Sequence, residues 1–241
     1  MSGRTFLHAL VPAAALCVLW AGVACAEGYP DEAKTSAAAL QQVLDRGDAK
    51  VQFQLGEMYA RGQGVPKDLA KAAALLQKSA DQGYGPAQTN LGGMYFLGQG
   101  VPKDLAKAAE LWQKAADQGD AKAQGVLGTM YARGRGVPKD AAKAAALLQK
   151  AADQGEARAQ NSLGWMYLQG DGVPKDAAKA AALFQKSADQ GSVAALYDLA
   201  VCYLQGQGVV KDEEKGCDLL RDAAAKGEDR SQEVLDRYCS K

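Results

Sequence analysis

Apolar side chains early in the chain follow two helical stripes that are separated by a polar turn. At helical spacing in residues 49–61 lie Leu55, Met58 and Tyr59, with Gly56 on the same side. The second stripe consists of Leu69, Ala72, Ala73, Leu76 and Ala80. The carboxylate of Asp68 is suited to capping the start of this stripe, and Gly83 is suited to ending it. The pattern predicts two helices joined by a turn.

This two-helix pattern recurs with a period of about 36 residues. The glycines that close the pattern are Gly47, Gly83, Gly119, Gly155, Gly191 and Gly227. They delimit five full repeats, which are residues 48–83, 84–119, 120–155, 156–191 and 192–227. A fixed period of this kind indicates stacked helical repeats rather than one globular core. The predicted fold class is all-α.

The flanks of the array keep the same register. Residues 31–47 match the second half of a repeat, and residues 228–239 match the first half, with Leu235 over Leu199. We therefore expect an N-terminal capping half-repeat at residues 31–47 and a C-terminal capping helix within residues 228–241. The polar side chains of the last segment suit a terminal element with no neighbour on its outer side.

The first 26 residues have the composition of a secretory signal peptide, and residues 27–30 form a short linker. Arg4 precedes an apolar stretch that ends in small residues, so we expect cleavage after Ala26. An uncleaved membrane anchor and lipidation at Cys25 are the alternatives, and only these would give membrane association. The expected location is the periplasm or the extracellular space. Cleavage would remove His8, the single histidine of the sequence.

Composition argues against catalysis and against nucleic-acid binding. The chain carries 28 basic and 28 acidic side chains, so there is no basic excess to attract nucleic acid. Without histidine, the mature chain has no Ser-His-Asp or Cys-His arrangement and no histidine-containing zinc site. No serine is followed three residues later by lysine, which a Ser-x-x-Lys nucleophile requires. We expect no catalytic residue, no metal site and no cofactor.

The repeated phrase "AxxxLGxMYxxGxGVPKDxAKAAxLxQKAADQG" resembles the Sel-one-like repeat (SLR), a relative of the tetratricopeptide repeat. The resemblance covers residues 31–239 and implies a right-handed α/α superhelical solenoid of helix-turn-helix repeats, whose first helices line a concave groove. It also implies a role as adaptor or scaffold in protein interactions. Three residues depart from the repeated pattern, namely Ala200, Val210 and Asp236.

Candidate binding residues are those that differ between repeats while facing the groove in the geometry that the resemblance implies. They are Phe53, Glu57, Arg61, Thr89, Phe96, Arg133, Asn161, Trp165, Gln169, Tyr197 and Gln205. Phe96, Trp165 and Tyr197 are suited to anchoring a peptide, or they shield an edge of the solenoid. The expected partner of a monomeric chain is an unknown protein or peptide, such as an envelope or host component. An envelope polysaccharide or peptidoglycan ligand, and an assembly scaffold acting through its convex face, are the alternatives.

Side chains repeated in every repeat are expected to be structural. This applies to the tyrosines at the position of Tyr59 and to Trp112, which takes a core position of the second helix. Cys202 and Cys217 lie on faces that we expect to meet within repeat five, so they are the predicted disulfide. A free Cys239, or its pairing with either of the two, is the alternative.

Overall fold

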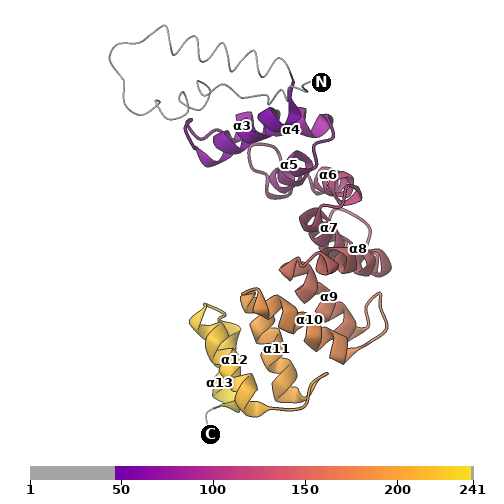
Figure 1. The fold of residues 1–241 in the computed structure, drawn as a ribbon, viewed down its shortest axis with the longest axis vertical. Coiled ribbons are helices and arrows are strands. Elements are labelled where there is room, and N and C mark those ends of the chain that lie inside the picture. The colour runs from indigo at the N-terminus through magenta and orange to yellow at the C-terminus, as the bar shows by residue number, and fades with distance from the viewer. Residues whose placement is uncertain (1–46, 240–241) are drawn as a thin grey trace, which may run out of the picture. The chain divides into compact units, whose positions relative to one another are not determined.

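The structure, a computed structural model, describes residues 47–239. The predicted signal peptide with its predicted cleavage after Ala26, Cys25, the predicted linker and nearly all of the predicted N-terminal half-repeat lie outside these residues. Within them the chain forms eleven α-helices and no strand (Figure 1). The predictions of an all-α class and of a tandem 36-residue repeat are confirmed.

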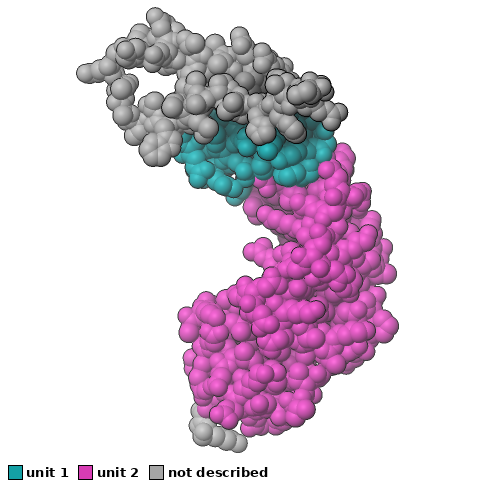
Figure 2. Space-filling model, viewed as in Figure 1, with its two compact units in different colours: residues 1–87, 99–101 teal, residues 88–98, 102–241 magenta. Residues whose placement is uncertain are grey.

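The helices alternate between the first and second positions of the repeats. They are α3 (Ala49–Arg61), α4 (Leu69–Asp81), α5 (Gly85–Leu97), α6 (Leu105–Asp117), α7 (Ala121–Arg133), α8 (Ala141–Asp153), α9 (Ala157–Gln169), α10 (Ala177–Asp189), α11 (Val193–Gln205), α12 (Glu213–Ala225) and α13 (Arg230–Tyr238). The chain divides into two compact units (Figure 2). Among the described residues, unit 1 comprises residues 47–87 and 99–101, and unit 2 comprises residues 88–98 and 102–239. In unit 2, consecutive helices from α6 to α13 pack on one another.

Each second helix begins at an aspartate, as the sequence predicts. The Oδ1 atom of Asp68 accepts a hydrogen bond from the backbone N–H of Lys71 at 2.9 Å. Such a bond satisfies one of the free amides in the first helical turn. The backbone N–H of Asp68 donates to the carbonyl of Tyr59 at 3.0 Å, which closes the turn between the two helices. The same pair of bonds recurs at Asp140 in repeat three.

The turn between helices requires its second glycine for two reasons, as Gly136 illustrates. Its φ of 75° lies in the left-handed region, which side chains other than glycine rarely adopt. A Cβ atom there would also lie 2.6 Å from the backbone oxygen of Leu105. The turn of repeat three therefore rests directly on the start of the second helix of repeat two.

The two helices of a repeat cross at a glycine. In repeat three, a Cβ atom on Gly128 would lie 2.8 Å from Cγ of Leu148 and 3.2 Å from the carbonyl oxygen of Ala144. In repeat five the arrangement is reversed, because Ala200 replaces the glycine of the first helix and Gly216 replaces the alanine of the second. A Cβ atom on Gly216 would lie 3.2 Å from the Ala200 oxygen. The departure at Ala200 is therefore accompanied by a compensating glycine.

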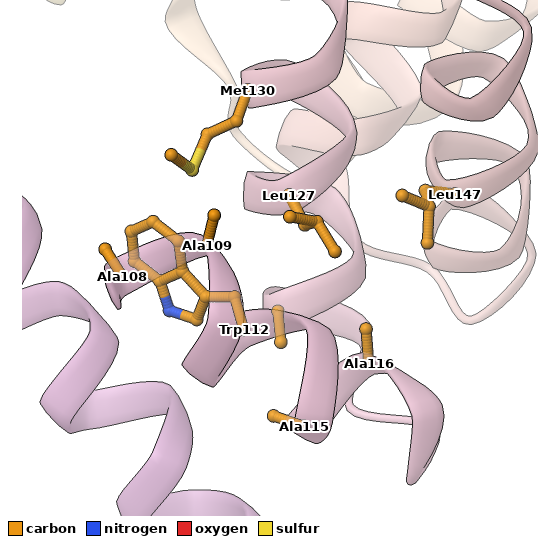
Figure 3. Close-up of a cluster of buried hydrophobic side chains, with 9 residues drawn as sticks. Ala108, Ala109, Trp112, Ala115, Ala116, Leu127, Met130 and Leu147 are labelled. Atoms are coloured by element: carbon orange, nitrogen blue, oxygen red, sulfur yellow. The ribbon is translucent and has the colours of Figure 1, made fainter. Parts of the chain in front are cut away.

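The core of unit 2 lies between successive helices and is built from small and aliphatic side chains. Around Trp112 it includes Ala108, Leu127 and Met130 (Figure 3). The indole N–H of Trp112 donates to the carbonyl of Thr89 at 3.0 Å. The predicted packing role of Trp112 is confirmed by its burial.

A ladder of buried glutamines ties neighbouring repeats together, and the sequence analysis missed it. Gln124 donates from Nε2 to the Ala116 carbonyl at 3.1 Å and accepts from Gln154 at 2.8 Å. The next repeat has the same bonds, from Gln160 to Ala152 and from Gln190 to Gln160. Because both side-chain polar atoms of the buried Gln124 and Gln160 have a partner, burying these two amides is not penalised. The ladder stops at repeat five, where leucine and lysine take these positions.

The repeated tyrosines lie half-buried at the ends of the first helices, each under a lysine. The Nζ atom of Lys143 lies 4.2 Å from the centroid of the Tyr131 ring and 2.7 Å from its hydroxyl. The equivalent Lys71 lies 5.6 Å from the centroid of Tyr59. The repeated contact accords with a structural role for the tyrosine.

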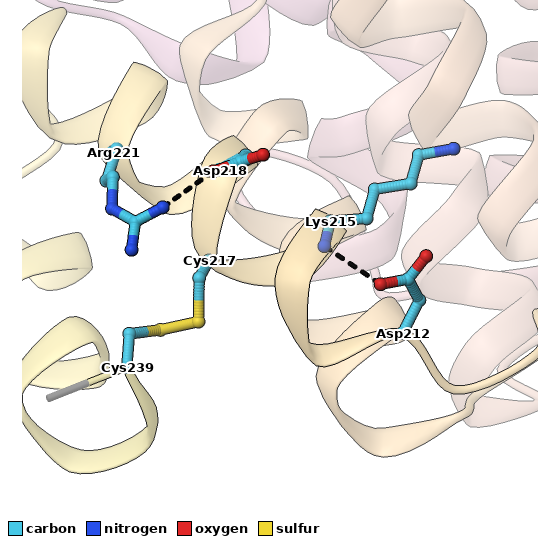
Figure 4. Close-up of a disulfide and its surroundings, with 6 residues drawn as sticks. All are labelled: Asp212, Lys215, Cys217, Asp218, Arg221 and Cys239. Carbon is cyan, nitrogen blue, oxygen red and sulfur yellow. Dashed lines mark hydrogen bonds and ion pairs between the residues drawn. A yellow bond between two sulfur atoms is a disulfide. The ribbon is translucent and has the colours of Figure 1, made fainter. Parts of the chain in front are cut away.

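The predicted disulfide between Cys202 and Cys217 is wrong. Cys217 on α12 pairs with Cys239, which follows α13 (Figure 4). Cys202 is a buried free thiol. The error lies in which faces meet. Cys202 lies in a cluster that includes Ala181 of the preceding repeat and Ala223 of α12, whereas Cys217 lies in a different cluster with Val234 and Leu235 of α13 and its adjoining Cys239. Second helices use this face against the next first helix.

Candidate binding face

The predicted binding residues of unit 1 all lie on α3. The guanidinium Nη2 of Arg61 lies 2.8 Å from Oε1 of Glu57, one helical turn away. Both side chains are accessible to solvent, so this ion pair adds little to stability. The ring of Phe53 packs edge-on against Tyr84, with 5.3 Å between the ring centroids. Phe53, Glu57 and Arg61 belong to unit 1, whereas the other predicted binding residues belong to unit 2.

In unit 2, Arg133, Gln169 and Gln205 are exposed at the ends of their helices. Phe96 is half-buried, with its ring 5.5 Å from that of Trp112 between centroids. The guanidinium carbon of Arg135 lies 5.1 Å from the Phe96 centroid. Phe96 is therefore covered on two sides.

The assignment of Thr89 to the binding surface is wrong. Its side chain is only 5% exposed, and its backbone carbonyl accepts the indole hydrogen bond of Trp112. The bulky Trp112 side chain approaches α5 at Gly92, where a Cβ atom would lie 2.8 Å from the indole nitrogen. The position of Thr89 on its helix therefore faces the core.

A group of side chains between α9 and α11 centres on Asp198, which the sequence analysis did not identify. Its Oδ2 atom accepts a hydrogen bond from Nδ2 of Asn161 at 2.7 Å and another from the indole Nε1 of Trp165 at 2.8 Å. The Trp165 ring also packs edge-on against Phe184, with 5.9 Å between centroids. Trp165 nevertheless remains 38% exposed. We refer to Asn161, Trp165 and Asp198 as the Asp198 group.

Asp198 is a buried carboxyl with incomplete hydrogen bonding. It is 4% exposed, and its Oδ1 atom has no hydrogen-bond partner among the described residues. Burial raises the pKa of Asp198 above its ordinary value, against the opposing effect of the bonds from Asn161 and Trp165. The charge of Arg230 also favours the ionised form, whereas that of Glu228 opposes it. A partly unsatisfied buried carboxyl is costly to the fold, which makes it a candidate functional feature.

Sequence differences between repeats contain a signal for Asp198. Its counterparts in the other four repeats are Gln54, Asn90, Val126 and Ser162, so the aspartate occurs once. Asp198 is not among the predicted groove residues, because tetratricopeptide-like geometry assigns the neighbouring Tyr197 to the groove. Asp198 lies on the more buried side of the helix.

Tyr197 connects this region to the C-terminal helix. The guanidinium carbon of Arg230, the first residue of α13, lies 4.3 Å from the Tyr197 centroid. The Nε atom of Arg230 also lies 2.7 Å from Oε1 of Glu228. A guanidinium over an aromatic face is attracted by the ring electrons, so this contact helps dock the start of α13.

The described residues offer little reactive chemistry. Burial, with a smaller contribution from Asp198, raises the pKa of the Cys202 thiol to about 11, so the reactive thiolate is scarce at neutral pH. Residues 47–239 contain no group of three or more His, Cys, Asp or Glu side chains placed to hold a metal ion. In this same part of the chain, we find no helix with the length and apolarity needed to cross a membrane.

Comparison with known proteins identifies the repeat. The sequence profile named Sel1 repeat matches residues 49–84, 85–120, 121–156, 157–192 and 193–228. No curated protein matches the chain.

Two solved structures are similar over most of the chain. A protective antigen of uropathogenic Escherichia coli with an SLR fold is 37% identical, with a TM-score of 0.74 over 81% of this chain. This chain spans only 42% of that antigen. A Sel1 repeat protein from Oxalobacter formigenes is 29% identical, with a TM-score of 0.76 over 92% of this chain and 86% of its own. With its five matched repeats, the chain belongs to the Sel1 repeat family.

Proposed function

We propose that this protein is exported and binds an extended segment of a partner protein in unit 2. The proposed binding face is the surface formed by the first helices of the repeats, α5, α7, α9 and α11. The Sel1 repeat fold supports a protein-interaction scaffold in general, and the family is generally non-catalytic. The observation that carries the finer proposal is the environment of Trp165.

Trp165 has the properties of an anchor residue for a polypeptide ligand. Its indole N–H is bonded to Asp198 and its ring packs against Phe184 in a T-shaped arrangement, yet 38% of the residue is exposed. A large aromatic surface that is already held in place loses little conformational entropy on binding. Such residues contribute much of the binding energy in protein interfaces. The equivalent positions carry smaller or non-aromatic side chains, Glu57, Gly93, Thr129 and Val201.

Other residues of the same face suit the rim of such a site. Leu97 is 61% exposed at the end of α5, and the equivalent residue of α7 is the exposed Arg133. Exposed apolar and polar side chains on the first helices, together with an aromatic anchor, resemble the mixed composition of transient interfaces. This composition favours a protein or peptide ligand.

The proposed export rests on the N-terminal sequence and is supported by the disulfide. Residues 1–26 have the pattern of a signal peptide, and the Cys217 to Cys239 bond suits an oxidising compartment. Expression in a bacterial host followed by cell fractionation and N-terminal sequencing tests this part. A mature chain that starts at Glu27 outside the cytoplasm is the expected result, and a cytoplasmic chain that starts at Met1 would contradict it.

A peptide selection tests the binding site. A phage-displayed library of random dodecamers is selected on immobilised residues 27–241, and enriched peptides are then measured by calorimetry. We expect Trp165→Ala to weaken their binding at least tenfold, since loss of an interface anchor costs about 2 kcal/mol or more.

Val210→Ser is the matched control, because it removes a different exposed apolar side chain, one that lies in a turn. It should leave the affinities unchanged. Peptides that bind Trp165→Ala as tightly as the wild type would refute the proposed site, provided that circular dichroism shows the variant to be folded.

A further inference from the structure

Of the three candidate aromatic side chains on the proposed binding face of unit 2, Phe96 and Tyr197 each contact an arginine, whereas Trp165 does not. The Phe96 and Tyr197 rings each lie under a guanidinium from the same chain, that of Arg135 at 5.1 Å and that of Arg230 at 4.3 Å. Within the described residues, no cation lies over the Trp165 ring, although it is the most exposed of the three. Tryptophan is also the aromatic side chain that attracts cations most strongly.

Asp198 gives the open Trp165 ring a negative neighbour. Its carboxylate accepts the indole hydrogen bond at 2.8 Å, so its charge lies at the edge of the ring. The charged groups near Asp198 are Arg230 and Glu228, which pair with each other at 2.7 Å. When Asp198 is ionised, the carboxylates of Asp198 and Glu228 and the guanidinium of Arg230 together carry a net charge of one negative unit. Because Asp198 is buried, water screens this charge less than it would screen a surface carboxylate.

We propose that Trp165 and Asp198 form an acceptor for an arginine side chain of the bound polypeptide. The guanidinium stacks on the indole of Trp165, a residue that is 38% exposed, and Asp198 supplies the opposite charge. This inference rests on the proposed function and specifies the chemistry of its ligand. Asn161 has a positioning role, because its bond to Oδ2 holds the carboxylate beside the indole.

Two internal contacts favour arginine over lysine as the preferred cation. Both cations that lie over Phe96 and Tyr197 are arginines, whereas the cations over the five repeated tyrosines are lysines. A guanidinium is planar and weakly hydrated, so it stacks on an aromatic ring at a smaller desolvation cost than an ammonium group. Lysine peptides should therefore bind more weakly than arginine peptides and more tightly than neutral ones.

Nuclear magnetic resonance gives a direct reading of this site. Residues 27–241 contain two tryptophans, Trp112 and Trp165, so the indole region holds two N–H signals, which Trp112→Phe assigns. The probes are the blocked tripeptides acetyl-Leu-Arg-Leu-amide and acetyl-Leu-citrulline-Leu-amide, titrated at pH 7.5 and low salt. We expect the arginine peptide to shift the Trp165 signal saturably and to bind at least fivefold more tightly than its citrulline counterpart.

Two variants should change the preference for arginine in opposite directions. Asp198→Asn removes the charge while keeping a hydrogen-bond acceptor, and should abolish the preference for arginine over citrulline. Arg230→Gln removes the nearest competing cation, and should tighten arginine binding about twofold or more. Asp153→Asn, at an exposed helix end on α8, is the matched control and should change neither affinity.

The outcomes separate this inference from the proposed function. Equal binding of the arginine and citrulline peptides, or a preference that survives Asp198→Asn, would overturn the arginine acceptor. The absence of any saturable shift in the wild-type protein would also overturn it. In each case, the proposed binding site would still be supported if peptides selected from the library bound Trp165→Ala more weakly than the wild type.

Discussion

At the scale of single residues, Asp198 shows how one substitution in a repeated frame creates a distinct environment. Four repeats place an uncharged residue at this position, whereas repeat five buries a carboxyl there between α9 and α11. The bonds from Asn161 and Trp165 compensate for only part of the lost hydration, because Oδ1 has no partner within the described residues. The same carboxyl holds Trp165 in place, so a cost to folding accompanies a preorganised surface.

The raised pKa of Asp198 predicts how its contribution to stability depends on pH. The folded protein holds the proton more tightly than the unfolded chain, because burial disfavours the charged form. This contribution is fully present below the unfolded pKa of about 3.8 and is lost as pH rises through the raised folded pKa. The free energy of unfolding of wild type, relative to Asp198→Asn, should therefore fall between pH 3 and pH 7. Urea denaturation of both proteins across this range measures the difference, and a constant or rising value would contradict it.

At this scale, the predictions from sequence were most successful for residues whose type recurs at the same position in every repeat. Trp112 was correctly assigned to the core, since every repeat has a bulky residue at its position. Thr89 was wrongly assigned to the surface because the groove geometry was transferred from a related repeat. The glutamine ladder escaped notice because only apolar positions were assigned to packing, although Gln124 is buried with its amide satisfied.

At the scale of helices, local sequence was a good guide to where elements begin and end. The aspartate caps and the glycines of the turns have local geometric causes, and both recur in each repeat. Local sequence does not determine which faces of two helices meet, because this depends on tertiary packing. The predicted disulfide between Cys202 and Cys217 was wrong for this reason. Cys202 and Cys217 occupy the expected positions on their helices, but they belong to two different clusters, that of Cys202 with residues of α10 and that of Cys217 with residues of α13.

Two adjacent glycines in α5 provide a test of helix packing. A Cβ atom on Gly92 would lie 2.8 to 3.0 Å from three atoms of the Trp112 indole, which is buried and hydrogen-bonded. A Cβ atom on Gly93 would have no contact within 4 Å. Overpacking costs about 1–3 kcal/mol, more than the roughly 1 kcal/mol that alanine gains over glycine in a helix. We expect Gly92→Ala to lower the free energy of unfolding by up to about 2 kcal/mol and Gly93→Ala to raise it by about 0.5–1 kcal/mol.

Chemical denaturation of the two alanine variants under identical conditions gives this comparison. Gly93→Ala is the matched control for the intrinsic preference of the helix, because only the direction of the added methyl differs. If both substitutions stabilised the protein, the close approach of Trp112 to α5 would be wrong.

At the scale of the molecule, contacts in unit 2 are local along the chain. The main packing partners of α7 are α6, α8 and α9, and α13 packs on α12. Stability in such an array is approximately the sum of repeat stabilities and of the interfaces between neighbours. Within the described residues α13 packs mainly on α12, and no side-chain hydrogen bond caps its start. Its docking therefore depends strongly on the Cys217 to Cys239 disulfide, whose effect should not spread far into the array.

Replacing both bonded cysteines with serine tests this locality. The disulfide joins residues separated by 22 positions, and loss of a loop of this size costs about 3 kcal/mol in the chain-entropy description. We expect amide hydrogen exchange to accelerate throughout α13 and at its contacts on α12, while α7 to α10 keep their protection. Chemical reduction of the wild-type protein is the control, and it should give the same pattern because Cys202 is already a free thiol. Faster exchange spread evenly over α7 to α10 would instead mean that unit 2 opens as a single cooperative body, so that the last helix stabilises repeats it does not contact.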